Sequence, residues 1–481
     1  MRTQKAMKNA IIGIITYLLA FLPQFIVRKA FLDTLGEEVL GLNSLFMNLI
    51  SYLSIVEMGI SSAIIFSLYR PFAEGDKVKI KGYLDYYDKF YKIAGTIIFI
   101  LGLILLPFLH VFINNDLDVN IQQAQWYFIL FLVNTYISYL FTYKFCLLNV
   151  AQESYKISIA NTMTKFATAI LQFIALIVFP RFDIYIFIQI IVNLIQYIIL
   201  NRYIDKKFKW LKIIKGEITK QEKADLTKNV KALFIHKIGS IFVFGTDNIV
   251  ISAFINLSAV ARYNNYNMII NAIQGVVRAA ISAITPSIGN MLVEKDATES
   301  YKVHQRLFLL NFWVSSFVVI VLYNVSTQFV TSWLGADATI DNLTLSVVLI
   351  NFYFYLMRSP VESFKEGSGR YHEDRYASIF ESAINLTLSI ILVRKIGLVG
   401  VFIGTFISNV AVLFWVKPLI TYKYVFNRSL LDYFKTYFKY CFIALIPLIA
   451  TIILTKEIKS NATFLMVIIN VFINTFIINS I

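Results

Sequence analysis

Charge and cysteine are both scarce in this sequence of 481 residues. Charged residues make up 15% of the chain, whereas a soluble globular domain has roughly 25%. Hydrophobic residues make up 58%, and the mean hydropathy is +0.67. The two cysteines, Cys146 and Cys441, both lie in apolar runs, which excludes a disulfide framework and a thiolate metal site. The composition therefore predicts a protein that crosses a membrane several times.

Signatures of catalysis and of nucleotide binding are missing as well. The sequence has no P-loop pattern and no Gly-Lys dipeptide, so it lacks the loop that cradles nucleotide phosphates. Its four histidines are far apart and have no second histidine or cysteine at metal-ligand spacing. The longest predicted outer loops, INNDLDVNIQQAQ and STQFVTSWLGADATIDN, are too short to hold a catalytic domain. We therefore expect neither an enzyme nor a bound cofactor.

Long apolar runs are what the sequence has in abundance. A helix that crosses a bilayer needs about 20 apolar residues, and fourteen runs approach this length. They lie near residues 10–30, 39–68, 93–113, 124–148, 157–179, 182–200, 232–255, 259–290, 307–327, 340–357, 376–395, 397–415, 436–455 and 463–481. With a cytoplasmic N-terminus, only seven of the 44 basic residues fall at outer ends. The positive-inside rule thus places both termini in the cytoplasm, and it explains the net charge of +15 without nucleic acid.

The apolar pattern has one long interruption, which runs from Arg202 to Lys231 and is dense in lysine. The sequence after it resembles the sequence before it, because a shift of 220 residues superposes the tripeptide SAI at 62–64 on 282–284. Six spans separate the two starts, so the copies are parallel repeats about an axis along the membrane normal. We therefore predict an all-α polytopic membrane protein with two parallel six-helix lobes around a central cleft. The predicted parts are an N-terminal lobe at 1–201, a basic cytoplasmic connector at 202–231, a C-terminal lobe at 232–430 and two additional transmembrane helices at 431–481.

The loop after the second predicted span interleaves lysines with tyrosines in RPFAEGDKVKIKGYLDYYDKFYK. Asp76 is a candidate helix N-cap in this loop. A helix that begins there would lie on the inner leaflet, with each lysine attracted to anionic lipid. An ordinary polar loop is the alternative.

Ionisable residues inside the predicted spans are the candidates for function, because each costs roughly 2.5–3.5 kcal/mol at mid-depth. Glu57 and Arg278 lie near the middles of the second and eighth spans, and the 220-residue shift sets them at similar depth. We expect both to face the cleft and to pair in one conformation, with packing inside a single lobe as the alternative. Lys165 is deeply embedded in the fifth span, and Asp247 is embedded in the seventh. Helix packing is the alternative for Asp247.

Four further ionisable residues lie nearer the ends of their spans. Arg28 and Arg262 are close to outer ends, where snorkelling of the side chain to the interface is the competing explanation. Glu362 and Glu381 border the cytoplasmic side of the tenth and eleventh spans. These two carboxylates are candidates for proton coupling.

Segments spread along the chain resemble a known family. They are GLNSLFMNLISYLSIVEMGISSAIIFSLYRPFAEGD, TDNIVISAFINLSAVARYNNYN and ESAINLTLSIILVRKIGLVGVFIGTFISNV. All three are similar to bacterial polysaccharide repeat-unit flippases of the multidrug/oligosaccharidyl-lipid/polysaccharide exporter superfamily. The shared patterns of small and polar residues identify the family better than the substrate.

The resemblance implies a V-shaped, two-lobed bundle in the bacterial cytoplasmic membrane. By alternating access it would move an undecaprenyl-diphosphate-linked oligosaccharide to the outer leaflet, for capsule, exopolysaccharide or O-antigen synthesis. The candidate substrate contacts in the cleft are Lys165, Arg278, Arg28 and Arg262, and the candidates for ion coupling or cleft pairing are Glu57, Asp247 and Glu381. Expected partners are the lipid-linked oligosaccharide, membrane lipids, a polysaccharide polymerase and glycosyltransferases. A flippase for the peptidoglycan precursor or for teichoic acid, and a multidrug exporter, are the alternatives.

Overall fold

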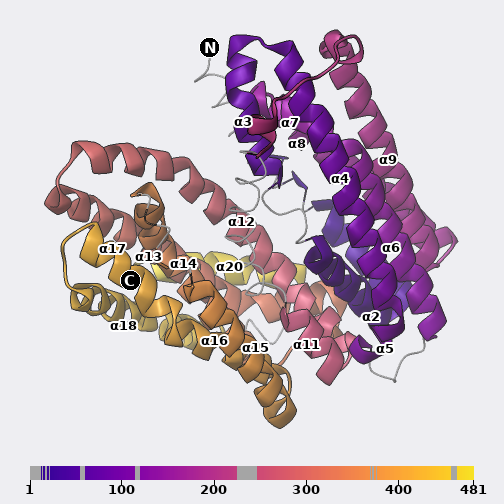
Figure 1. Cartoon of the computed structure of the whole chain (residues 1–481). Coiled ribbons are helices and arrows are strands. Elements are labelled where there is room, and N and C mark those ends of the chain that lie inside the picture. Colours follow the sequence, from indigo (N-terminus) through magenta and orange to yellow (C-terminus); the bar gives the residue numbers. More distant parts are fainter. Residues whose placement is uncertain are drawn as a thin grey trace. The chain divides into compact units, whose positions relative to one another are not determined.

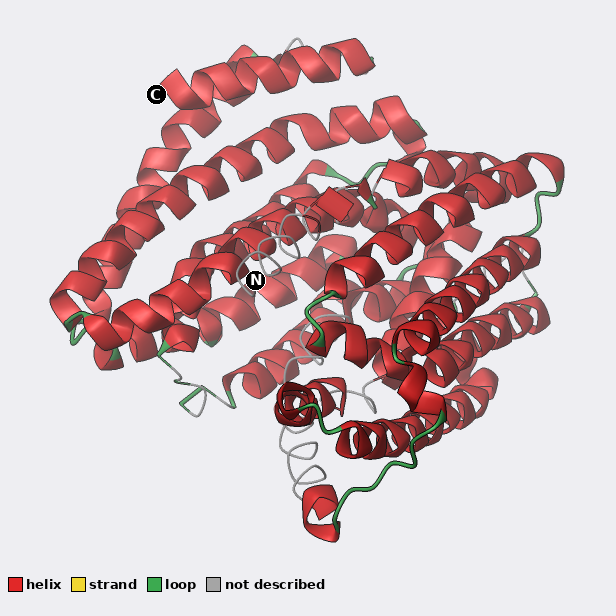
Figure 2. Cartoon of the chain, turned by 90° about the horizontal axis from the view of Figure 1, so that it is seen from above, coloured by secondary structure: helices red, strands yellow, loops and turns green. Residues whose placement is uncertain are grey.

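The computed structural model describes most of the chain as helix. The described residues are 12, 15, 16, 19, 20, 22–54, 60–113, 120–224, 246–368, 370, 373, 374, 376–456 and 463–480. Among them every regular element is a helix and none is a strand (Figure 2). The chain divides into two compact units, Met1–Ile241 and Phe242–Ile481. The prediction of an all-α membrane protein is confirmed.

Eight of the described helices are long and apolar enough to cross a membrane. They are Lys77–Phe112, Ile121–Val150, Ser154–Val178, Phe182–Lys207, Ala297–Leu334, Ala377–Ile396, Leu398–Tyr424 and Leu430–Leu454. The other predicted runs fall on α2 (Leu22–Leu53), α3 (Ile60–Glu74), α11 (Thr246–Phe254), α12 (Leu257–Glu294), α14 (Asn342–Gly367) and α20 (Phe464–Ser480). The chain is therefore a multi-pass membrane protein, and the total of fourteen spans stays a prediction.

The first unit is a bundle whose helices pack along their lengths. Its other main helices are α4 (Lys77–Leu105), α6 (Ile121–Phe141), α7 (Cys146–Val150), α8 (Ser154–Val178) and α9 (Phe182–Lys207). α4 packs on α6, α6 on α9, and α8 on both α2 and α9 (Figure 1). Gly102 of α4 leaves room for the Leu132 side chain of α6, because a Cβ at Gly102 would lie 2.2 Å from that side chain.

The lysine- and tyrosine-rich loop is part of a membrane helix. Asp76 caps α4 as predicted, because its carboxylate accepts a hydrogen bond from the backbone N–H of Lys79 at 3.0 Å. The alternative of an ordinary polar loop is wrong, because α4 runs unbroken from Lys77 to Leu105. Contact of its lysines with the inner leaflet stays a prediction. Tyr83, Tyr87 and Tyr91 are buried on this helix, and their packing extends it beyond the apolar run.

The described part of the basic connector docks on the start of α4. Gly216 meets Gly82 so closely that a Cβ on Gly216 would lie 2.3 Å from the Gly82 nitrogen. The backbone N–H of Glu217 donates to the carbonyl of Val78 at 3.3 Å. Lys79 pairs with Glu222 at 3.2 Å. The connector is therefore held against the first unit as far as these contacts reach, and the predicted domain boundaries stay predictions.

In the second unit, a proline in α14 is compensated by a neighbouring helix. The other helices of the second unit are α13 (Ala297–Leu334), α15 (Ala377–Ile396), α16 (Leu398–Ala411), α17 (Leu413–Tyr424) and α18 (Leu430–Leu454). Pro360 lies inside α14 and has no N–H to donate to the carbonyl of Leu356. Asn311 of α13 donates its side-chain N–H to that carbonyl at 2.9 Å. The side chain thus replaces the missing backbone bond, as membrane helices require.

The two C-terminal helices, α18 and α20, pack on α13 through a buried polar ladder. Asn324 of α13 donates to Thr451 of α18 at 2.9 Å and to Asn474 of α20 at 2.6 Å. Asn470 of α20 donates to the side chain of Gln328 at 2.9 Å and to the backbone carbonyl of Asn324 at 3.1 Å. All five side chains are buried. These bonds fix α20 against the unit where apolar contact alone provides little force between membrane helices.

Replacing Asn470 by Leu should loosen α20, because it removes two interhelical hydrogen bonds worth about 0.6–1.7 kcal/mol each. We expect a lower melting temperature of the detergent-purified protein, measured by intrinsic fluorescence. Asn479→Leu is the matched control, because Asn479 is exposed on the same helix and, among the described residues, its side chain bonds only to the Thr475 carbonyl. Equal melting temperatures for the two variants would contradict a stabilising role of the ladder.

A pH-dependent contact joins α8 to α9 at Glu153, which lies between two predicted spans. Glu153 accepts hydrogen bonds from Lys156 at 2.8 Å and from Lys207. Burial raises the pKa of Glu153, but the hydrogen bonds and charges of the two lysines outweigh it, so the pKa is lowered overall. A lowered folded pKa means stability that is present above the unfolded value of about 4.3 and lost as pH falls through the folded value.

We therefore expect Glu153→Gln to lower the melting temperature at pH 7, and we expect this effect to shrink as the pH falls from 7 towards 3. Thermal melts of the variant and the wild type across this range provide the measurement. A difference between the two proteins that does not change with pH would show that the charge of Glu153 contributes nothing.

Candidate functional site

The predicted substrate-binding cations lie on helices of both units. In the first unit, Lys165 is exposed on α8, and partly buried Arg28 on α2 interacts electrostatically with Tyr185 of α9. In the second unit, Arg262 and Arg278 both lie on α12, partly buried and exposed respectively. The structure therefore leaves Lys165 and Arg278 available to a ligand on their own units.

Arg278 also has a partner within its own unit. Its Nη2 donates to the hydroxyl of Tyr355 on α14 at 3.1 Å. This contact matches the alternative of packing inside one lobe, although the side chain of Arg278 remains exposed. Glu57 lies outside the described residues, so its pairing with Arg278 stays a prediction.

Asp247 lies in a polar region where α11 meets α12, α15 and α16. It is partly buried on α11 and interacts electrostatically with Tyr263 of α12. Its neighbour Asn248 accepts a hydrogen bond from Asn264 of α12 at 3.3 Å, as the helix-packing alternative requires. α11 also packs on α15 and α16, which are joined by a hydrogen bond from Asn385 to Thr405 at 3.0 Å. Asp247 thus lies on a helix that packs on three others, next to an asparagine that is hydrogen-bonded to α12.

A cluster of buried and partly buried charges joins α14, α15 and α17. Glu362 of α14 accepts with one oxygen from both Arg358 Nε, at 2.9 Å, and Lys417 Nζ of α17, at 2.6 Å. Arg358 is 7% exposed, and its Nη1 has no hydrogen-bond partner among the described residues. Buried charges of both signs here come from helices that are distant in sequence.

Glu381 of α15 completes this cluster. It is 4% exposed, and its Oε2 has no hydrogen-bond partner in the described part of the chain. Arg358, Lys417 and Glu362 all act on it electrostatically. Glu362 and Glu381 were candidates from the sequence, whereas Arg358 and Lys417 were not singled out there. The spacing of four between Arg358 and Glu362 on one helix was the available signal.

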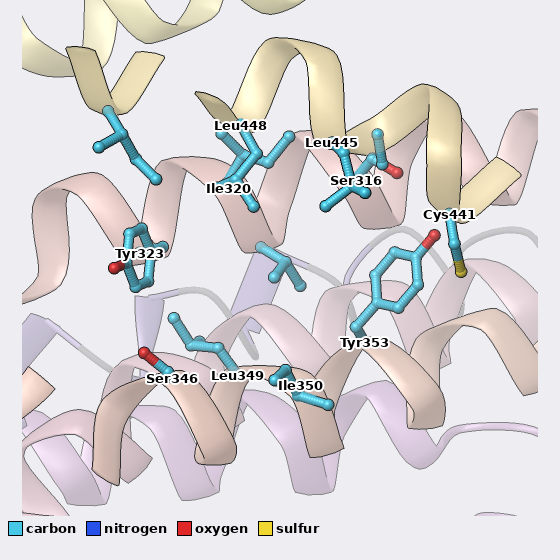
Figure 3. Close-up of a pocket in the computed structure, with 13 residues that line it drawn as sticks. Ser316, Ile320, Tyr323, Ser346, Leu349, Ile350, Tyr353, Cys441, Leu445 and Leu448 are labelled. Atoms are coloured by element: carbon cyan, nitrogen blue, oxygen red, sulfur yellow. The ribbon is translucent and has the colours of Figure 1, made fainter. Parts of the chain in front are cut away.

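An apolar cavity of about 360 Å³ opens between α13, α14 and α18 (Figure 3). Tyr323 lies at one end of it, and Tyr353 lies beside Cys441 at the other (Figure 3). Aliphatic side chains such as Ile320, Leu349 and Leu448 line the space between. Such walls suit hydrocarbon rather than a sugar. No described group of three or more His, Cys, Asp or Glu residues is arranged to hold a metal ion.

Residues 6–292 match a protein family described as "Polysaccharide biosynthesis protein". A search of curated protein sequences finds no match. Among solved structures, the fold is similar to the lipid II flippase MurJ in an inward closed conformation, with a TM-score of 0.72 and 15% identity. That similarity covers 98% of each chain.

Multidrug transporters are also similar in fold. A variant of the Vibrio cholerae MATE transporter VcmN has a TM-score of 0.58 and 15% identity, covering 89% of this chain and 99% of that one. An inward-facing multidrug resistance MATE transporter of the MOP superfamily has a TM-score of 0.59 and 14% identity, covering 84% and 95%. The fold is therefore that of this superfamily.

Replacing Glu362 by Gln should destabilise the second unit, because Arg358 and Lys417 would lose the carboxylate that they share. Breaking a fully buried pair costs about 3–5 kcal/mol. The Glu362 side chain is 24% exposed, so we expect a smaller loss, on the order of 2 kcal/mol, in denaturant unfolding of the purified protein.

Glu74→Gln is the matched control for this measurement. Arg70 Nε and Glu74 Oε1 form the same type of pair at 2.8 Å, but on the surface, with side chains 88% and 51% exposed. Its loss should cost little stability, because solvent screens an exposed ion pair. A cost for Glu362→Gln no larger than that of this control would contradict a stabilising role of the buried cluster.

Proposed function

We infer the function from the family to which this chain belongs, the polysaccharide biosynthesis protein family, and propose that it is a flippase. Its substrate would be an oligosaccharide repeat unit linked to undecaprenyl diphosphate, moved from the inner to the outer leaflet of the bacterial cytoplasmic membrane. The observation that carries the proposal is the family match over residues 6–292.

The similarity to the lipid II flippase supports a lipid-linked substrate. It extends over 98% of this chain, whereas the similarities to the two MATE transporters cover 89% and 84%. The flippase fold therefore accounts for more of the chain than the drug-transporter fold does. A flippase of the peptidoglycan precursor is the second candidate, favoured by the same likeness.

The physical need for such a protein follows from the substrate. A sugar chain and a diphosphate cannot enter hydrocarbon without losing their hydrogen bonds to water, whereas the isoprenoid tail is at home there. Lys165 would attract the diphosphate as a point charge, and Arg278 would hold it with its planar guanidinium. The apolar cavity between α13, α14 and α18 offers a surface that a hydrocarbon tail can contact.

The driving force would come from the membrane potential, from an ion gradient, or from both. An inside-negative potential favours outward movement of an anion by about 2.3 kcal/mol per charge per 100 mV. Asp247 and Glu381 are the described candidates for coupling to an ion. Glu381 is the stronger of the two, because it is buried beside two cations yet its Oε2 accepts no hydrogen bond in the described structure.

The partners would be the enzymes that act before and after translocation. Glycosyltransferases would build the lipid-linked unit on the inner leaflet, and a polymerase would join the units on the outer leaflet. The product would be a capsule, an exopolysaccharide or an O-antigen. Both termini of the flippase would lie in the cytoplasm.

Lys165→Gln and Arg278→Gln should each slow flipping about tenfold or more, because a hydrogen bond to a charged group contributes about 1.5–3 kcal/mol. The measurement is the fraction of lipid-linked oligosaccharide trapped on the inner leaflet in cells that carry each variant in place of the wild type. Lys395→Gln is the control, because Lys395 is an exposed cation at the end of α15.

The same cells identify the substrate. Trapped oligosaccharide on the lipid carrier supports the repeat-unit flippase, whereas trapped peptidoglycan precursor supports the second candidate. Normal flipping by both variants, at wild-type protein levels, would contradict the assignment of these two cations to the substrate.

A further inference from the structure

A polar cavity of about 310 Å³ opens where the ends of α12, α14 and α17 meet the start of α13. It belongs entirely to the second unit. The residues that carry the argument are Gly289, Lys295, Ser300, Gly367, Arg370 and Tyr424, all of which line it. Eleven residues of α12 separate Arg278 from Gly289, a distance of about 16 Å at 1.5 Å per residue. The cavity is therefore distinct from the proposed substrate contact at Arg278.

Two backbones approach closely along one wall of this cavity. A Cβ built on Gly367 of α14 would lie 3.1 Å from the backbone nitrogen of Gly289 on α12. Neither residue has a side chain to extend into the cavity. The space there is consequently bounded by peptide groups, which a polar ligand can approach without an intervening side chain.

Ser300 lines this cavity with a hydroxyl that no described group satisfies. The residue is 1% exposed, and its Oγ makes no hydrogen bond within the described part of the chain. A buried hydroxyl without a partner is destabilising, so a ligand that accepts a hydrogen bond is favoured here. Ser300 is also in the first turn of α13, a helix of 38 residues whose N-terminal end carries partial positive charge.

Two cations from different connections line the same cavity. Lys295 follows α12, and its Nζ lies 3.5 Å from Glu299. Arg370 follows α14, pairs with Glu373 at 2.8 Å and lies over the Tyr424 ring, 5.3 Å from its centroid. The Lys295 and Arg370 side chains are each 45% exposed. Because such exposed ion pairs are weak, an incoming anion competes with both carboxylates.

We propose that this cavity binds the phosphate group of an anionic phosphate ester. Ser300 donates its hydroxyl hydrogen, Lys295 supplies a point charge, and the Arg370 guanidinium offers a planar pair of donors that matches phosphate. The phosphate comes either from a phospholipid headgroup or from a small soluble ester, and this chemistry is common to both. The inference concerns binding alone and does not rest on the flippase assignment.

The test uses the full-length protein in nanodiscs and two probes. One arm titrates glycerol 3-phosphate into nanodiscs of zwitterionic lipid and measures affinity by thermophoresis. The other arm counts phosphatidylglycerol molecules that the protein retains in native mass spectrometry after release from mixed nanodiscs. Binding in both arms, or in one, supports the site and identifies the source of the phosphate.

Three variants locate the site, and a fourth is the control. Lys295→Gln and Arg370→Gln should each weaken binding about tenfold, and Ser300→Ala should weaken it severalfold. Lys302→Gln also removes one positive charge. Lys302 is exposed on α13 and lies about 200° around this helix from Ser300, so its replacement should leave binding unchanged.

Ser300→Ala keeps the test informative if a charge variant folds poorly, because it removes one oxygen from a buried position. The proposal is overturned if neither probe binds the wild-type protein. It is equally overturned if Lys302→Gln weakens binding as much as Arg370→Gln does.

Discussion

A lipid bilayer offers a polar group no hydrogen-bond partner, so each polar group within it must be satisfied by another part of the protein. The described chain meets this constraint with helices, in which backbone N–H and C=O groups pair within one segment. The constraint also explains the contacts between helices. The Asn324 and Asn470 side chains hold α20 to α13, and Glu362 neutralises two cations from two helices. Hydrogen bonds and ion pairs between polar side chains thus hold apolar helices together.

The exceptions to this constraint are the most informative groups. Glu381 and Ser300 are both buried, and each has an oxygen that no described group satisfies. Packing alone gives no reason to retain such groups, because each costs stability. One lies among buried charges, and the other lines a cavity that basic side chains share. We proposed above that each position meets a species from outside the chain, an ion at Glu381 and a phosphate group at Ser300.

Much of the local structure could be predicted from the sequence, but few of the contacts between helices could. Asp76 was predicted as an N-cap because capping depends on residues only three positions apart. The all-helical fold followed from composition and from the lengths of the apolar runs. In contrast, the run of lysines and tyrosines after Asp76 was assigned to the membrane surface, because its pattern does not reveal that Tyr87 and Tyr91 pack into a helical bundle.

Contacts between residues that are distant in the sequence were harder to predict. Lys417 lies 55 residues from Glu362, and no periodicity connects them. Apolar spans show which residues can be buried but not which helix faces which. For the same reason Arg278 was predicted to face a cleft, and its contact with Tyr355 on α14 was not anticipated. Because the positive-inside rule accounts for basic residues at cytoplasmic ends, the burial of Arg358 was not predicted.

The compensated proline of α14 has a mechanical consequence. Because Asn311 of α13 holds the carbonyl that Pro360 leaves free, any change in the curvature of α14 at this point must also disturb α13. Arg358 and Glu362 lie on either side of Pro360 and would shift with it. A displacement of α13 at Asn311 would therefore reach the Arg358–Glu362 pair of α14 through this one hydrogen bond.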